Sequence, residues 1–123
     1  MKTYLVKTPK FVHRLFPKRV WAFPNSKNSV YLTFDDGPIP EVTPWVLDQL
    51  RKYQAKATFF CVGENVKKHT LVFDQVVKSG HSVGNHTFNH LNGWGSDNIP
   101  YFHNIRNCAH LVKSSLFRPP YGR

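Results

Sequence analysis

The chain has 123 residues, enough for one domain with its own core but short for a closed (β/α) barrel, which usually needs roughly 200 residues or more. Its 17 Lys and Arg against 7 Asp and Glu give a net charge of +10, and no acidic residue occurs before Asp35 or after Asp97. No apolar run approaches the length of a membrane span, so no transmembrane helix is predicted. The charge favours polyanions such as nucleic acid, anionic lipid or an acidic cell wall, and it equally fits an ordinary basic protein.

Residues 1–29 form a basic, aromatic extension in front of the first strand signal. The segment lacks an uninterrupted hydrophobic stretch and a small-residue cleavage site, so we predict no signal peptide. We expect the extension to cover the floor of a barrel, with contact to an anionic membrane or cell-wall surface as the alternative. The pattern leaves the cellular compartment open and is compatible with association with the cell envelope.

From residue 30 onward, strand and helix signals alternate. Residues 30–34 form an apolar strand, and Thr43 followed by Pro44 predicts the cap and first position of a helix. Residues 57–62 are an unbroken apolar run, typical of a strand that is buried on both faces of a parallel sheet. The helix between these strands is predicted to bury a stripe of Val46, Leu47, Leu50 and Tyr53.

The second half of the chain continues the alternation. A helical stretch runs to about Ser79, with its later part capped by Thr70 and ended by Gly80. Residues 82–85 form a third strand, residues 99–112 a helix, and residues 116–117 begin a fourth strand. The inward side chains of the two helical segments are predicted to be Phe73, Val76 and Val77, then Phe102, Ile105, Ala109 and Val112.

This order of elements implies an α/β fold with parallel strands and right-handed crossovers. In such folds the chemistry sits at the carboxyl ends of the strands, and three polar motifs follow the first, third and fourth strands. The two cysteines, Cys61 and Cys108, fall in a predicted buried strand and helix, so we expect buried free thiols.

The first motif places two adjacent carboxylates, Asp35 and Asp36, between a strand and a Gly-Pro turn. Alone it fits a turn as well as an active-site loop. The second motif places His86 and His90 four residues apart, so that on one helical turn both rings would face the same point, as a divalent metal requires. With 7 histidines in the chain such a pair also arises by accident, but Asp36 would complete a ligand set with open positions for water and substrate.

The third motif, residues 118–122, offers a fixed cation and a stiff backbone. Its two prolines lack amide donors and hold the amide of Tyr121 in one place, as an oxyanion-binding donor must be held. The alternative is a rigid loop that ends a strand.

Together, the three motifs closely resemble the polysaccharide deacetylase family, carbohydrate esterase family 4, which includes chitin, chitooligosaccharide and peptidoglycan N-acetylglucosamine deacetylases. The resemblance assigns residues 30–123 to a deacetylase domain and residues 1–29 to an extension. It implies the N-terminal part of a distorted (β/α) barrel of the glycoside hydrolase and deacetylase type, incomplete after about four parallel strands.

By this resemblance, the catalytic groups are Asp35, the general base, Arg118, which orients that base, and the backbone amide of Tyr121, which binds the oxyanion. The resemblance further implies that the chain removes N-acetyl groups from a polysaccharide or oligosaccharide, and it does not distinguish peptidoglycan from a chitin-like polymer.

The same resemblance makes Asp36, His86 and His90 the ligands of a divalent metal. Zinc is expected, and cobalt, nickel and manganese suit the mixed nitrogen and oxygen donors as well. His81 matches no family ligand, so we interpret it as structural.

The chain departs from the family after the third motif. Family members continue with an Asp-Trp type motif and a Leu-x-Leu-His type motif whose histidine is the general acid, whereas this chain stops at Arg123. We therefore expect a truncated chain that is a poor enzyme, with an open sheet edge that favours self-association. The alternative is an inactive remnant that binds metal or sugar without turnover.

A nucleic-acid partner is not predicted. The charge of +10 motivates that hypothesis, but the chain lacks the clustered pattern of aromatic and basic residues that nucleic-acid modules carry.

Overall fold

The computed structural model describes residues 8–23 and 29–122. The chain divides into two units, Met1–Val30 and Tyr31–Arg123. In the first unit, α1 (Lys10–Leu15) leads to a turn in which the ring of Trp21 stacks on His13, with 4.7 Å between centroids. The cover and surface-contact roles of the extension stay predictions. Within the described ranges, every helix is too short or too polar to cross a membrane.

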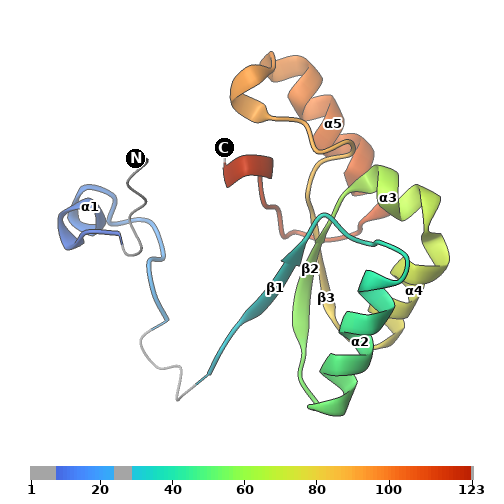
Figure 1. Ribbon diagram of the computed structural model, residues 1–123. Helices are drawn as coiled ribbons and strands as arrows, with labels where there is room; N and C mark the ends of the chain where they lie inside the picture. The colour runs from blue at the N-terminus through green and yellow to red at the C-terminus, as the bar shows by residue number, and fades with distance from the viewer. Residues whose placement is uncertain (1–7, 24–28, 123) are drawn as a thin grey trace, which may run out of the picture. The chain divides into compact units, whose positions relative to one another are not determined.

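The second unit is built on a parallel sheet with the order β1 (Leu32–Asp35), β2 (Ala57–Cys61) and β3 (Ser82–Asn85) (Figure 1). The register pairs Asp35 with Phe60 and Cys61 with Asn85. All three strands therefore end at nearly the same level, and the segments that follow them start side by side. The predicted α/β class with parallel strands is confirmed.

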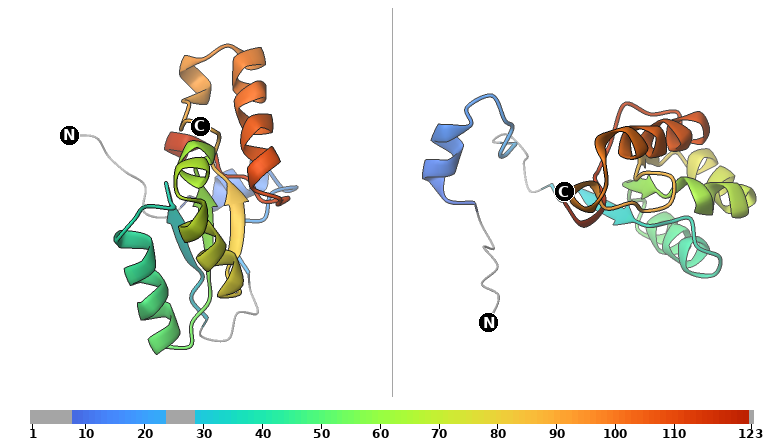
Figure 2. Two further views of the ribbon diagram at one scale, coloured as in Figure 1. Left: turned by 90° about the vertical axis from the view of Figure 1, so that its right-hand side faces the viewer. Right: turned by 90° about the horizontal axis from the view of Figure 1, so that it is seen from above.

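Helices cover one face of this sheet. Helices α2 (Val42–Lys52), α3 (Gly63–Lys68) and α4 (Thr70–Lys78) lie on the same side, in front of the strands in the left view of Figure 2. Helix α5 (Asn98–Leu111) contacts α3 and β3. Two short 3-10 turns, η1 (Gly93–Gly95) and η2 (Pro120–Gly122), precede α5 and end the described chain.

The core lies between the sheet and these helices. Alternate side chains of β2 enter it, because successive residues of a strand point to opposite faces. Val76 of α4, Cys108 of α5 and Val112, just beyond the end of α5, are fully buried there. The buried cluster consists of Leu47, Leu50, Ala57, Phe59, Cys61, Val66, Val76, Cys108 and Val112.

The strand boundaries differ from the predicted ones at both ends of the unit. The first strand begins at Leu32, since pairing with β2 starts there, and Val30 and Tyr31 are exposed. The predicted fourth strand is reduced to one parallel bridge between Asn85 and Phe117. The two prolines that follow cannot donate to a sheet ladder, which ends the pairing.

Neither predicted threonine cap is formed as expected. Helix α2 begins at Val42, one residue before Thr43, whose hydroxyl accepts a hydrogen bond from the N–H of Ile39 at 2.9 Å. The hydroxyl of Thr70 donates to the carbonyl oxygen of Val66 at 3.1 Å. Thr43 therefore ties a loop to its helix, and Thr70 joins α4 to α3.

Three residues that were predicted to face inward are exposed: Tyr53, Val77 and Phe102. Tyr53 lies one residue beyond the end of α2. Successive residues of a helix are about 100° apart around its axis. Val77 and Phe102 are exposed because the preceding residues, Val76 and Tyr101, occupy the better buried positions. The buried stripe of α5 passes instead through Cys108, and Val112 continues it.

Both cysteines are free, buried thiols, as predicted. Burial raises the pKa of Cys61 to about 12, and the nearby Cys108 adds to this effect. Burial also raises the pKa of Cys108, whose thiol donates to the carbonyl oxygen of Cys61 at 3.5 Å. Both groups stay protonated at neutral pH.

We expect both thiols of the folded chain to resist a thiol reagent at pH 8. With a pKa of about 12 for Cys61, the thiolate population is about 10³-fold smaller than that of a free cysteine. Labelling with a chromogenic disulfide should be slow in buffer and should reach both cysteines in guanidinium chloride. Rapid labelling of the native chain would contradict the burial of these groups.

Gly84 lies where β3 approaches Phe60 of β2. A Cβ at this position would stand 2.5 Å from the Phe60 ring and 3.2 Å from Cβ of Leu116. The ring has little room to move, because the guanidinium of Arg118 lies over it with 4.1 Å to its centroid.

Replacing Gly84 with Ala should lower the free energy of unfolding by roughly 1–3 kcal/mol through overpacking. The matched control is Gly95→Ala, because a Cβ on Gly95 meets its nearest atom, in Asn92, at 4.0 Å. Urea denaturation of both variants and the parent measures the difference. Equal destabilisation by the two substitutions would show that contact with Phe60 is not the cause.

Candidate metal centre and active site

The candidate site lies at the carboxyl ends of the parallel strands, where the three polar motifs meet. Asp35 is the last residue of β1, and Asp36 follows it. His86 follows the last residue of β3, and Arg118 follows the bridge that Phe117 makes with that strand. The common level of the strand ends therefore brings together segments that are up to 83 residues apart.

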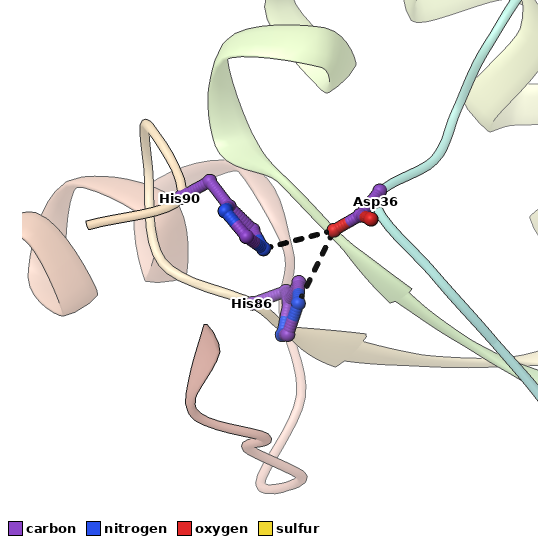
Figure 3. Close-up of side chains that lie close together, drawn as sticks. All are labelled: Asp36, His86 and His90. Atoms are coloured by element: carbon purple, nitrogen blue, oxygen red, sulfur yellow. Dashed lines mark ion pairs between the residues drawn. The ribbon is translucent and has the colours of Figure 1, made fainter. Parts of the chain in front are cut away.

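Asp36, His86 and His90 point their donor atoms at one another (Figure 3). Oδ1 of Asp36 lies 3.3 Å from Nε2 of His86 and 3.1 Å from Nε2 of His90. One donor atom from each residue lies within 4.8 Å of the other two. His86 is buried, whereas Asp36 is exposed, so the cluster opens to solvent on the aspartate side.

This geometry fits a metal ion. A tetrahedral zinc ion with bonds of about 2.0–2.2 Å holds its ligand atoms roughly 3.3–3.6 Å apart. The two distances from Asp36 Oδ1, 3.1 and 3.3 Å, are close to that separation. Two imidazole nitrogens and one carboxylate oxygen also form a common ligand set for zinc and other divalent transition metals.

The tautomer of His86 supports the same interpretation. Its Nδ1 lies 2.7 Å from the carbonyl oxygen of Arg118. A carbonyl can only accept a hydrogen bond, so Nδ1 carries the proton. In the neutral ring Nε2 is then an acceptor that faces the acceptor Oδ1 of Asp36. Either a second proton or a cation between them must offset their repulsion.

The loop that carries Asp36 is held from three sides. Asp36 has a φ of 70°, in the left-handed region, and its carbonyl oxygen accepts from the side-chain amide of Asn65 at 2.7 Å. The carbonyl oxygen of Gly37 accepts from the N–H of Val62 at 3.0 Å. The hydrogen bond from Ile39 to Thr43 closes the loop. Asn65 was not identified from the sequence, because no local pattern links residues so far apart.

The segment that carries the two histidines is a loop, so the predicted helical turn is wrong. Thr87 and His90 have φ values of 64° and 59°, which no α-helix contains. The carbonyl oxygens of Thr87 and Phe88 accept from the N–H groups of Gly63 and Glu64, at 3.0 and 2.7 Å. These backbone bonds, and not a helical period, bring the two imidazoles together.

Gly63 is essential to this contact. A Cβ at position 63 would lie 2.7 Å from the Phe88 ring and 3.2 Å from Cα of both Phe88 and Cys108. Only a glycine lets the start of α3 approach the histidine loop closely enough to donate to it.

Asp35, next to Asp36 in the chain, forms an ion pair with Arg118 beside the candidate ligand cluster. Nη1 of Arg118 donates to Oδ1 of Asp35 at 2.7 Å and to the hydroxyl of Thr33 at 3.0 Å. The guanidinium also lies over the ring of Phe60, with 4.1 Å to the ring centroid, and this cation–π contact adds to its anchoring. The structure therefore places Arg118 against the carboxylate that it was predicted to orient.

Tyr121 lies at the rim of the site. Its ring meets His90 edge to face, with 4.8 Å between centroids, and its φ is 59°. The geometry brings Tyr121 to His90 of the candidate ligand cluster, while the use of its amide as an oxyanion donor stays a prediction.

His81 lies away from this cluster, before the start of β3. Its Nδ1 accepts from the N–H of Ala57 at 3.4 Å, and its ring packs against Phe59. Burial lowers its pKa, and Lys56 lowers it further. These contacts agree with the structural role that the sequence predicted.

Comparison with known proteins adds an independent line of evidence. The family model for polysaccharide deacetylase matches residues 23–123. A peptidoglycan-N-acetylglucosamine deacetylase of Bacillus cereus is 42% identical over 107 residues, which cover 83% of this chain and 50% of that protein. A chitooligosaccharide deacetylase of Azorhizobium caulinodans is 38% identical over 104 residues, covering 79% of this chain and 50% of the relative.

Solved structures give the same result. The peptidoglycan deacetylase PdaC from Bacillus subtilis superposes with a TM-score of 0.72 at 35% identity, over 75% of this chain and 48% of that one. A family 4 carbohydrate esterase from Streptomyces lividans, solved in complex with acetate, superposes with a TM-score of 0.72 at 30% identity. The match covers 76% of this chain and 52% of that one.

The chain thus spans about half the length of the relatives that it matches. The family model, in contrast, matches far more than half of this chain, and the match includes all three polar motifs. The chain belongs to the polysaccharide deacetylase family.

Proposed function

We propose that the site is the metal-dependent centre of a hydrolase that removes N-acetyl groups from a polysaccharide. The observation that carries the proposal is the convergence of Asp36, His86 and His90 on one point, with Asp35 held beside it by Arg118. An amide bond resists attack by water, so its hydrolysis needs an activated water and a polarised carbonyl.

Asp36, His86 and His90 would hold a divalent metal. Zinc is our first choice, and cobalt, nickel or manganese would also suit the donors. The bound metal supplies Lewis acidity, which polarises the carbonyl and lowers the pKa of water. The exposed side of Asp36 leaves room for water and substrate to approach.

Asp35 would accept the proton of the attacking water at its carboxylate. Arg118 binds Oδ1 of this carboxylate, which fixes its position. The backbone amide of Tyr121, at the rim beside His90, would donate to the oxygen that becomes negative on the substrate. Each of the three groups thus performs one step: proton transfer, orientation or charge stabilisation.

The names of the relatives support a proposal for the substrate class. Those described above are named for peptidoglycan N-acetylglucosamine and for chitooligosaccharide. We propose an N-acetylated glycan of this kind, peptidoglycan or chitin-like. A peptidoglycan substrate would place the protein at the cell envelope.

Metal or sugar binding without turnover is the second candidate function. Among the structural neighbours is a mutant of a family 4 pseudoenzyme with restored activity, at 31% identity and a TM-score of 0.66. The match covers 79% of this chain and 38% of the pseudoenzyme chain. The family therefore includes at least one member described as lacking activity.

The 123-residue chain should bind about one divalent metal ion, and His86→Ala should weaken binding at least ~10²-fold, because it removes a buried ligand. His110→Ala is the matched control, since this histidine is exposed near the end of α5. Titration calorimetry with zinc, together with the visible spectrum of bound cobalt, measures metal binding by the two variants and the parent. Equal affinity of His86→Ala and the parent would remove His86 from the ligand set.

In a complete version of the domain, Asp35→Asn should reduce acetate release from N-acetylglucosamine oligomers by about 10²–10⁴-fold and leave metal affinity within about threefold of the parent, because it removes the base and keeps the ligands. Asp36→Asn should weaken both turnover and metal binding.

The outcomes of this comparison separate the candidates. Equal turnover of Asp35→Asn and the parent would reject the assigned base. Loss of metal in Asp35→Asn alone would exchange the roles of the two aspartates. A parent chain that binds zinc and releases no acetate would support binding without turnover.

A further inference from the structure

One side chain of α5 holds the middle of the histidine loop. Oδ1 of Asn104 accepts from the N–H of Phe88 at 2.6 Å and from the N–H of Asn89 at 3.2 Å. Its Nδ2 donates to Oδ1 of Asn89 at 2.7 Å. Asn104 therefore makes three hydrogen bonds to two consecutive residues that lie between the two imidazoles.

The two histidines are anchored to different degrees. His86 directly follows β3, its N–H donates to the carbonyl oxygen of Cys61, and its ring is fixed by the carbonyl of Arg118. His90 lies at the far end of the loop, is partly exposed and has a left-handed backbone. The path from the fixed histidine to His90 runs through the two residues that Asn104 holds.

We propose that Asn104 is a positioning residue for the metal centre: it fixes the loop that carries His90 and thereby sets metal affinity. The inference rests on the proposed metal site and assigns a task to α5, a helix that supplies no ligand. Asn104 acts through the loop and touches neither the metal nor the substrate.

The chemistry of an asparagine suits this task. Its amide oxygen has two lone pairs and can accept from two backbone N–H groups at once, while its NH₂ group donates to a third partner. This orientation of the amide follows from the partners, since backbone N–H groups can only donate. Aspartate would keep the acceptors and lose the donor, and alanine would lose all three bonds.

Zinc titration of the 123-residue chain tests the proposal. Asn104→Ala should weaken zinc binding about 10–100-fold, the usual effect of removing a group that orients a metal ligand. Asn104→Asp should show a smaller loss, because the two backbone amides keep their acceptor. The cobalt spectrum of Asn104→Ala should also change, since the geometry at His90 relaxes.

Two controls separate positioning from general loosening. Asn107→Ala changes an exposed asparagine one turn further along α5 and should leave the zinc affinity within about twofold. Val112→Ala removes buried methyl groups just beyond the end of α5 and should lower stability without changing zinc affinity. Hydrogen exchange at the amide of Phe88 reports the loop directly and should accelerate more in Asn104→Ala than in either control.

The outcomes that overturn the inference differ from those that overturn the proposed function. Parental zinc affinity in Asn104→Ala would remove the positioning role and leave the metal site standing. A loss in Val112→Ala as large as that in Asn104→Ala would reduce the effect to general destabilisation and also reject the inference. A parent chain that binds no divalent metal would remove the metal site and the inference together, whereas zinc binding without acetate release would overturn the deacetylase activity alone.

Discussion

The junction between β2 and α3 is the constraint on which the rest of the site depends. Residues 62–65 donate hydrogen bonds to the carbonyl oxygens of Asp36 and Gly37 in one loop and to those of Thr87 and Phe88 in the other. The first N–H groups of a helix have no partner inside the helix and must be satisfied elsewhere. Here they are satisfied by the loops that carry the candidate ligands. The loops thus satisfy the donors at the start of α3, and these donors in turn fix the loops. A change at this junction would disturb both loops at once.

Arg118 connects the candidate metal ligands to the candidate base through two different parts of one residue. Its carbonyl oxygen accepts from the ring of His86, and its guanidinium binds Asp35 and Thr33. Its backbone is fixed in turn, because its N–H donates to the carbonyl oxygen of Asn85 at 3.0 Å. A shift of the loop after Phe117 would therefore move the candidate base and the candidate ligand His86 together.

The sequence predicts the elements of this site better than it predicts the contacts that shape them. The order of strands and helices follows from apolar periodicity and turn residues. The spacing of His86 and His90 points to one metal ion that both could bind. The reason given by the spacing, a helical turn, is nevertheless wrong, because the approach of the rings depends on left-handed residues and on hydrogen bonds from α3. Asn65 and Asn104 act across 29 and 15 residues of sequence, and a polar side chain on a helix gives no local sign of such a partner.

The two adjacent aspartates face different partners because the strand ends between them. Along β1, successive side chains point to opposite faces, so Thr33 and Asp35 share the face that meets Arg118, while Phe34 packs against Phe59 in the core. A further residue of regular strand would turn the next carboxylate toward the core face, where a charge would be costly. Asp36 instead leaves the strand with a φ of 70°, and this turn directs its carboxylate toward the histidine loop. One backbone torsion thus separates a carboxylate paired with an arginine from a carboxylate that faces two imidazoles. Two neighbouring residues of one type therefore lie in two different environments, as their proposed roles of base and metal ligand require.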